Sequence, residues 1–273
     1  MSDTIRLFVG TSANGEDAEA EAVLEYTARK HCSLPLEITW MRQAATGPWA
    51  GWKSNARGRT QFSAFRWGPP AVCGFAGRAI YTDVDFFFLA DLAELWRQNI
   101  PGSFVMLMKG PDGKLSKSSC ILFDCAKCRG HVPDIDTLKA MPDAHEAMLA
   151  YFRPRREQLI GGFSGDWNCV AYEKMKGATP PPLNLRDVKA YHFTRIEHQL
   201  HLRYAIPRLK AEGKSHWYTQ PVGPHPHAEL AAFYDGLYRE AMAAGYTPDR
   251  YRVQAFDGAA RREFGYRQRA VAS

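Results

Sequence analysis

The chain contains 273 residues, of which 45% are hydrophobic and 23% charged, and its formal net charge is +6. A chain of this length can bury one substantial core, and single α/β domains of this size are common. It contains no run of eighteen apolar residues and no basic start followed by an apolar stretch, so we expect neither a membrane span nor a signal peptide. We therefore expect a cytoplasmic protein whose six cysteines are reduced thiols.

Strand and helix patterns alternate over the first hundred residues. Residues 6–11 form a strand-like apolar run, residues 16–31 have apolar side chains at helical spacing, and residues 36–40 alternate as a second strand. This alternation predicts an α/β fold with a mostly parallel sheet. Because open sheets of this kind bind ligands at the carboxyl ends of their strands, the end of the first strand is expected at a nucleotide site. The residues placed there are Val9, Gly10 and Thr11.

Two carboxylates one residue apart interrupt a later strand pattern. Asp83 and Asp85 follow the strand-like residues 78–81 and precede another apolar run. Side chains at i and i+2 point to the same face of an extended strand, so both carboxylates could bind one hard cation. A lone Asp-x-Asp is also typical of a turn at a strand end. Here, however, Asp91 follows as the expected N-cap of a short helix over residues 92–96, and charges in such apolar surroundings need compensation.

This segment resembles the signature of glycosyltransferase family 8, in which a strand similar to Tyr-Leu-Asp-x-Asp is followed by an apolar run and Asp-Leu-x-Glu-Leu-Trp. The resemblance implies a GT-A fold, with a Rossmann-like sheet flanked by helices. It also implies transfer of a hexose from a nucleotide-sugar, expected to be UDP-linked, to an acceptor hydroxyl, with retention at the anomeric carbon. A divalent cation, Mn²⁺ or Mg²⁺, would be held by Asp83, Asp85 and a histidine at the end of a late strand, which His192 matches.

Several expected donor-binding positions either match a residue of the family or align with a family segment that has a different sequence here. Arg66 matches an arginine directed at the donor sugar and its phosphates, and the resemblance gives it a catalytic role beside the two aspartates. Ser118 and Ser119 stand in place of an Asn-Ala-Gly segment, and we expect them to bind the donor. The phosphate-binding lysine of the family is missing. Arg195 or His198 could take its place as the phosphate donor, or Gln199 could begin a looser version of the same turn.

The segment that faces the reacting carbon in the family, Asp-Gln-Asp, has no clear counterpart. Residues 158–162 occupy its approximate place, and the following Trp167 and Asn168 do resemble the family's Trp-Asn. The donor sugar and the stereochemical course therefore stay open.

Three cysteines offer an alternative metal site. Cys125 and Cys128 have the spacing of a zinc finger, with Cys120 before them and His131 after them. A structural zinc needs four ligands and no second Cys-x-x-Cys pair exists in the sequence, so we favour buried cysteines that act as small apolar residues.

The last quarter of the chain is predicted to be a helical, basic extension over residues 206–273, packed on a catalytic domain over residues 1–205. Residues 229–245 have apolar side chains at helical spacing and end at a glycine, and His225 and His227 are expected to precede this helix. Residues 261–269 interleave arginine with aromatic residues. We expect a solvated tail there, with peripheral contact to an anionic membrane as an alternative role.

The sequence leaves the acceptor and two other functions open. The acceptor could be a glycan, a lipid-linked sugar or a protein. A non-catalytic nucleotide-sugar-binding or scaffold protein is the first alternative to an enzyme. A basic nucleic-acid-binding protein is the second, but the positive charge is spread along the chain and no nucleic-acid motif accompanies it, so we expect no nucleic-acid partner.

Overall fold

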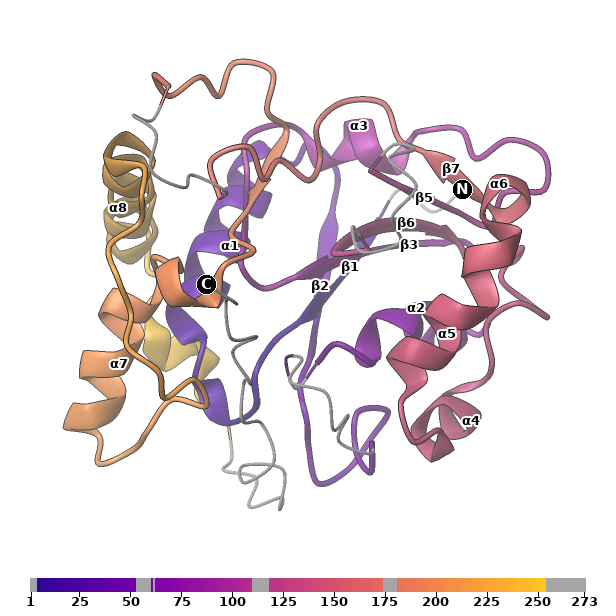
Figure 1. Ribbon diagram of the computed structural model, residues 1–273, viewed down its shortest axis with the longest axis horizontal. Coiled ribbons are helices and arrows are strands. Elements are labelled where there is room, and N and C mark those ends of the chain that lie inside the picture. Colours follow the sequence, from indigo (N-terminus) through magenta and orange to yellow (C-terminus); the bar gives the residue numbers. More distant parts are fainter. Residues whose placement is uncertain (1–3, 53–59, 61, 110–117, 174–180, 254–273) are drawn as a thin grey trace, which may run out of the picture.

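A six-stranded sheet forms the centre of the computed structural model, which describes residues 4–52, 60, 62–109, 118–173 and 181–253 (Figure 1). The strand order is β2-β1-β3-β6-β5-β7. Neighbouring strands are parallel except around β6, which is antiparallel to both β3 and β5. The bounds are β1 Ile5–Gly10, β2 Leu36–Met41, β3 Arg78–Asp83, β5 Met106–Met108, β6 Cys120–Asp124 and β7 Ile160–Gly162. The predicted mixed, mostly parallel α/β sheet is confirmed.

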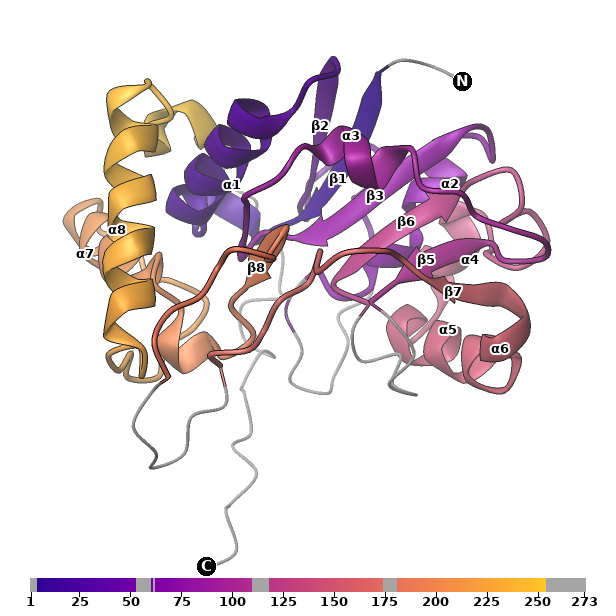
Figure 2. The ribbon, with the colours of Figure 1, turned by 90° about the horizontal axis from the view of Figure 1, so that it is seen from above.

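The central strands are apolar on both faces because other elements cover both sides of the sheet. In β1, Ile5, Leu7 and Val9 are fully buried and Phe8 nearly so, although an alternating strand would expose every second residue. Helices α1, α7 and α8 gather at one side of the molecule, and α4, α5 and α6 gather at the other, beside β5 and β7 (Figures 1 and 2).

The helices begin and end at identifiable signals. Asp91 caps α3 by accepting a hydrogen bond from the Ala93 N–H, as predicted, and His227 caps α8 by accepting one from the Leu230 N–H. The helix bounds are α1 Ala18–His31, α2 Pro69–Val72, α3 Leu92–Trp96, α4 Ile135–Ala140, α5 Ala144–Phe152, α6 Arg156–Leu159, α7 Leu202–Ala211 and α8 Ala228–Ala243. The 3₁₀ turns are η1 Ala13–Gly15, η2 Phe65–Trp67, η4 Arg153–Arg155, η5 Ile196–His198 and η6 Pro248–Tyr251.

A two-stranded ribbon accompanies the main sheet. Strand β4 (Phe86–Phe88) pairs antiparallel with β8 (Ala190–His192), and Phe86 lies opposite His192. The pairing joins the segment after β3 to a strand about a hundred residues further along the chain, so residues from both can share one site.

The described part of the C-terminal segment packs on α1 and on the ribbon. A buried cluster joins Val23 of α1, Phe87 of β4, Tyr191 of β8 and Leu230 of α8. The predicted boundary between residues 205 and 206 falls inside α7. Among the described residues, none of the helices combines the length and the apolar composition that crossing a bilayer requires.

Candidate metal centre

Asp83, Asp85 and His192 come together where β3 and the ribbon meet. Asp83 is the last residue of β3, Asp85 directly precedes β4, and His192 ends β8. The Phe193 N–H donates to the Asp85 carbonyl at 3.0 Å, which holds the two segments together beyond the ribbon. One potential ligand atom from each of the three residues lies within 4.8 Å of the other two. A single ion could therefore contact all three side chains.

The imidazole of His192 is oriented by a neighbour on each side. Its ring stacks on Phe86 with a centroid distance of 4.3 Å, and its Nδ1 lies 3.0 Å from Oδ1 of Asn168. Since an amide oxygen only accepts hydrogen bonds, Nδ1 carries the proton and the neutral ring keeps a lone pair on Nε2. That lone pair faces Asp85.

One carboxylate oxygen of Asp85 has no hydrogen-bond partner among the described residues. Its Oδ2 accepts a hydrogen bond from the side-chain amide of Gln199, which also donates to the Phe193 carbonyl at 2.9 Å. Its Oδ1 is buried, lies 3.3 Å from Nε2 of His192 and has no hydrogen-bond donor among the described residues. Two lone pairs that face each other at this distance require a proton or a cation between them. Burial lowers the pKa of His192, but the surrounding carboxylates, Asp85 foremost, together raise it above its ordinary value. The donor set therefore fits a divalent cation.

Asp83 is compensated by the protein itself. Arg66 of η2 donates to its two carboxylate oxygens at 3.1 and 3.3 Å, and the Tyr81 hydroxyl donates to its Oδ1. Burial raises the pKa of Asp83, although the Arg66 charge acts in the opposite direction. The same guanidinium donates to the Ser118 hydroxyl at 2.8 Å. The structure thus joins three residues singled out in the sequence, Asp83, Arg66 and Ser118, in one buried contact group.

The end of the first strand lies beside this group, but its side chains are engaged elsewhere. Gly10 is in register with Asp83 in the parallel β1–β3 pair. A Cβ at Gly10 would come within 2.7 Å of the Tyr81 hydroxyl oxygen, so the tyrosine requires glycine here. Val9 and Thr11 are fully buried, and the Thr11 hydroxyl donates to Glu21 at 2.6 Å. Neither Val9 nor Thr11 therefore exposes surface to a ligand in this structure.

The remaining expected donor residues have different surroundings. Ser119 is buried, and its carbonyl accepts the Asp83 N–H at 3.1 Å, which places it at the cluster. Arg195 is directed elsewhere: its guanidinium pairs with Glu197 at 3.0 Å and its backbone N–H donates to Glu173. Gln199, which was expected to begin a looser version of the family's turn, donates its side-chain amide to the Asp85 carboxylate.

The contacts of three residues in this site were not predicted from the sequence. Tyr81 could have been found, because it precedes Asp83 by two residues on the same strand and therefore shares its face. Asn168 was noticed as part of a Trp-Asn pair, but its contact with His192 depends on the isolated bridge between Cys169 and Tyr191. The contact of Gln199 with Asp85 has no local sequence signal, because the two residues are 114 positions apart.

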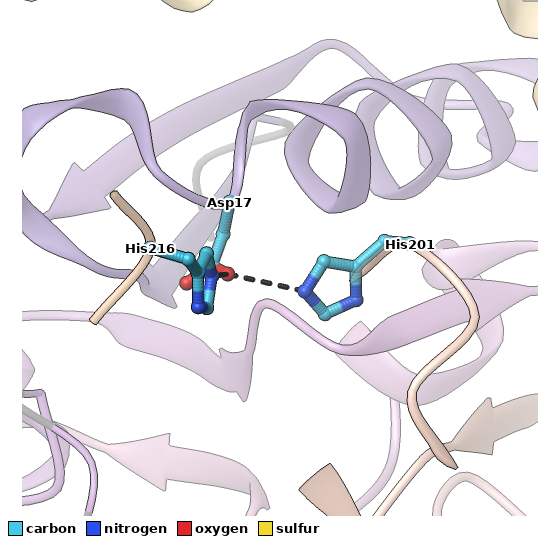
Figure 3. A group of neighbouring side chains, drawn as sticks. All are labelled: Asp17, His201 and His216. Atoms are coloured by element: carbon cyan, nitrogen blue, oxygen red, sulfur yellow. Dashed lines mark hydrogen bonds and ion pairs between the residues drawn. The ribbon is translucent and has the colours of Figure 1, made fainter. Parts of the chain in front are cut away.

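A second group of three carboxylate and imidazole side chains consists of Asp17, His201 and His216 (Figure 3). Both imidazoles place Nε2 on Oδ1 of Asp17, at 3.1 Å for His201 and 2.9 Å for His216. The Tyr218 N–H donates to Nδ1 of His216 at 2.9 Å, so this ring must carry its proton on Nε2 and donate it to Asp17. That nitrogen is therefore not free to ligate a metal. Burial raises the pKa of Asp17, but the hydrogen bonds from the two histidines lower it well below its ordinary value. We call this group the Asp17 latch.

The cysteines lie in the core. Cys120, Cys125 and Cys128 are fully buried, and burial raises the pKa of the Cys120 and Cys128 thiols above its ordinary value. Within the part of the chain that the structure describes, only the two groups above bring three potential metal ligands together. The zinc alternative therefore gains no support from the described residues.

Comparison with known proteins identifies the fold. No protein-family model matches the chain, and no curated protein matches it in sequence. Among solved structures, it is similar to the apo structure of the bifunctional glycosyltransferase WbbM, with a TM-score of 0.52 and 12% identity over 89% of this chain. The chain spans 50% of that longer protein. It is also similar to the galactosyltransferase LgtC, solved in complex with donor and acceptor sugar analogues, with a TM-score of 0.50 and 11% identity over 89% of this chain and 100% of that one. The chain therefore has the GT-A fold of these glycosyltransferases.

Proposed function

We propose that this protein is a glycosyltransferase that moves a hexose from a UDP-linked sugar to an acceptor hydroxyl. One observation carries the proposal: in a GT-A fold, the unsatisfied Oδ1 of Asp85 and the lone pair of His192 Nε2 face each other beside Asp83. The complex of LgtC with donor and acceptor sugar analogues supports a nucleotide-sugar donor and a sugar acceptor for this fold.

A divalent cation would be held by Asp83, Asp85 and His192. Two carboxylates with one imidazole suit Mn²⁺ better than Mg²⁺, which prefers oxygen ligands alone. When bound, the cation would offset the negative charge of the diphosphate that leaves as the glycosidic bond breaks. Asn168 and Gln199 would keep two of the ligands in place, since both are already bonded to them.

Arg66 would supply a fixed positive charge beside the leaving diphosphate. Its guanidinium is buried and held by Asp83 and Ser118, while its Nε has no hydrogen-bond partner among the described residues. A donor phosphate could accept that remaining N–H. Val9, Gly10, Thr11, Ser119 and Arg195 complete the proposed donor site, and retention at the anomeric carbon is proposed on the family resemblance.

The decisive test is the substitution Asp85→Asn, which removes a charge at nearly constant shape. We expect calorimetry to find that Mn²⁺-dependent binding of UDP weakens about 100-fold, since a metal site that loses a carboxylate ligand loses most of its affinity. Asp136→Asn, which changes a carboxylate that is 91% exposed on α4, is the matched control and should bind as the wild type does. Equal UDP affinity of Asp85→Asn and wild type would refute the site.

Turnover distinguishes an enzyme from a binding protein. We expect slow hydrolysis of UDP-hexoses without an acceptor, stimulated by Mn²⁺, because water can replace the acceptor hydroxyl. Metal-dependent UDP binding without any turnover over a panel of UDP-hexoses would instead favour a non-catalytic nucleotide-sugar-binding protein.

A further inference from the structure

A cavity of about 790 Å³ lies outside the candidate metal centre, between α7 and residues 214–224. Its volume is within the range of pockets that bind small molecules, roughly 300–1,000 Å³. One wall is a face of α7 and the other is the segment that follows this helix. The lining residues include Leu202, Ile206, Pro207, Lys210, Tyr218 and Val222.

Both walls of this cavity are held in place without a ligand. His216 is fixed to the start of α1 by the Asp17 latch, as Figure 3 shows, and it accepts the Tyr218 N–H. At the other end of the segment, the Gly223 N–H donates to the Glu197 carbonyl at 2.8 Å. Prolines at three of the lining positions further restrict the backbone. A ligand would therefore enter a site that is already formed, at a low cost in ordering.

The lining combines apolar surface with positive charge. Leu202, Ile206, Val222, Tyr218 and the three prolines provide the apolar part. The charged side chains are all basic, since among the described residues no aspartate or glutamate lines the cavity.

Three basic side chains, Arg203, Lys210 and Lys214, line the cavity beside this apolar surface. Two of them form ion pairs with described residues. Arg203 pairs with Asp235 and Lys214 pairs with Glu212. Lys210 is exposed and has no ion-pair or hydrogen-bond partner among the described residues. A ligand with an anionic group near Lys210 would compensate this charge.

The wall also offers one hydrogen-bond acceptor. Pro207 lies inside α7 and has no N–H, so the carbonyl of Arg203, four residues earlier, lacks the usual i+4 donor of an α-helix. Both residues line the cavity. A hydroxyl group on a ligand could donate to that carbonyl.

We propose that this cavity binds an anionic amphiphile, a molecule with an apolar chain or body and one anionic group. The apolar part would lie against Ile206, Val222 and the prolines, and the anionic group would pair with Lys210. The inference does not depend on the glycosyl-transfer reaction. The Gly223 end of the cavity contacts Glu197 and His198, which lie between His192 and Gln199 in the chain.

Calorimetry with dodecyl phosphate below its micelle concentration tests the proposal on the full chain. We expect one molecule to bind per chain. Inorganic phosphate, which lacks the chain, and dodecyl maltoside, which lacks the charge, should each bind at least about tenfold more weakly, because each loses one of the two contributions. Equal binding of dodecyl phosphate and dodecyl maltoside, or many molecules per chain, would overturn the proposal.

Three variants locate the binding. Lys210→Glu should weaken dodecyl phosphate binding about tenfold or more, and Val222→Trp, which fills the cavity, should abolish it. Arg239→Glu makes the same charge change at an exposed position of α8 and should leave the affinity within about twofold of wild type. Circular dichroism confirms that each variant is folded. Unchanged affinity in both cavity variants would refute the site.

Vesicles of phosphatidylglycerol identify the source of the amphiphile. Co-sedimentation that depends on Lys210 would indicate a membrane lipid, whereas binding of dodecyl phosphate without co-sedimentation would indicate a free amphiphile. Either result supports the proposal if Lys210→Glu reduces the binding.

Discussion

A histidine can ligate a cation through Nε2 only when that nitrogen carries no proton, and the partner of Nδ1 decides this. In His192, Nδ1 donates to the side-chain oxygen of Asn168, which leaves a lone pair on Nε2. In His216, Nδ1 accepts the Tyr218 N–H, which forces the proton onto Nε2. The two clusters of aspartate and histidine side chains therefore have different chemistry: the one around His192 can ligate a cation, and the Asp17 latch is an internal hydrogen-bond group.

Asn168 is accordingly expected to control metal affinity although it is not a proposed ligand. Asn168→Ala should weaken Mn²⁺ binding roughly 10- to 100-fold, because the imidazole loses the group that fixes its tautomer. Calorimetric titration with Mn²⁺ measures the effect directly. Asn168→Asp keeps an acceptor at the same position and should restore most of the affinity. Wild-type affinity in the alanine variant would show that Asn168 does not orient the ligand.

At the scale of elements, α1 has an acidic side that its apolar pattern does not reveal. Asp17, Glu19, Glu21 and Glu25 are all buried, and each is bonded to a residue from another part of the chain. Glu19, for example, accepts two hydrogen bonds from Arg208 of α7. These carboxylates hold α7, η6 and the residues after β2 against one helix.

The latch should contribute strongly to stability. Asp17→Ala removes the acceptor of two buried imidazole N–H groups, and we expect the free energy of unfolding to fall by about 3 kcal/mol, since each unsatisfied buried donor costs roughly 1–3 kcal/mol. Urea unfolding at pH 7 measures this loss. The exposed Asp187 offers the control Asp187→Ala, expected within about 0.5 kcal/mol of wild type. A similar small loss in both variants would contradict the latch.

The raised pKa of the buried Glu21 carboxyl makes the stability of the protein depend on pH. Burial raises its pKa from 4.5 to about 7, against the lowering effect of Arg42 and the Thr11 hydrogen bond. The folded protein therefore keeps this proton at pH values where the unfolded chain has released it. The free energy of unfolding should fall between about pH 5 and pH 7, by up to ~1.4 kcal/mol per pH unit from this group, and level off above.

The variant Glu21→Gln isolates this contribution, because the glutamine side chain does not titrate. The difference in unfolding free energy between wild type and variant should shrink or change sign as the pH rises from 5 to 7. Glu37→Gln, at an exposed position of β2, should follow the wild-type curve. Parallel curves for wild type and Glu21→Gln would rule out a raised pKa at Glu21.

At the scale of the whole molecule, we predict that the C-terminal extension unfolds together with the sheet. Leu230 of α8 is fully buried in a cluster with residues of α1, β4 and β8. Leu230→Ala should lower the free energy of unfolding by roughly 2–5 kcal/mol and shift a single transition. Arg239→Ala, on the exposed side of the same helix, should change it by less than about 0.5 kcal/mol. Two separate transitions in urea, one sensitive to Leu230→Ala and one not, would mean that the extension is an independent unit.

The sequence predicted what depends on local pattern. Alternating strands and helices indicated the sheet, and the Asp-x-Asp segment with a late strand-end histidine indicated three residues that the fold does bring together. It could not predict contacts that depend on the packing of distant segments. Gln199 reaches Asp85 across 114 positions, and Asp17 meets His201 and His216 across 184 and 199. Arg195 was expected at the donor phosphates, but its neighbour Glu197 holds its side chain. The roles of the expected donor residues stay predictions.

The register of the β4–β8 ribbon has a consequence for changes in chain length. Phe86 lies opposite His192, and side chains on a strand alternate between the two faces. One residue inserted into or deleted from the segment before β8 would turn the imidazole to the opposite face and bring Tyr191 or Phe193 toward the aspartates instead. Single-residue insertions and deletions just before β8 should therefore abolish function regularly, whereas many substitutions there should be tolerated. This holds although the segment lies about a hundred residues from Asp83 and Asp85 in the sequence.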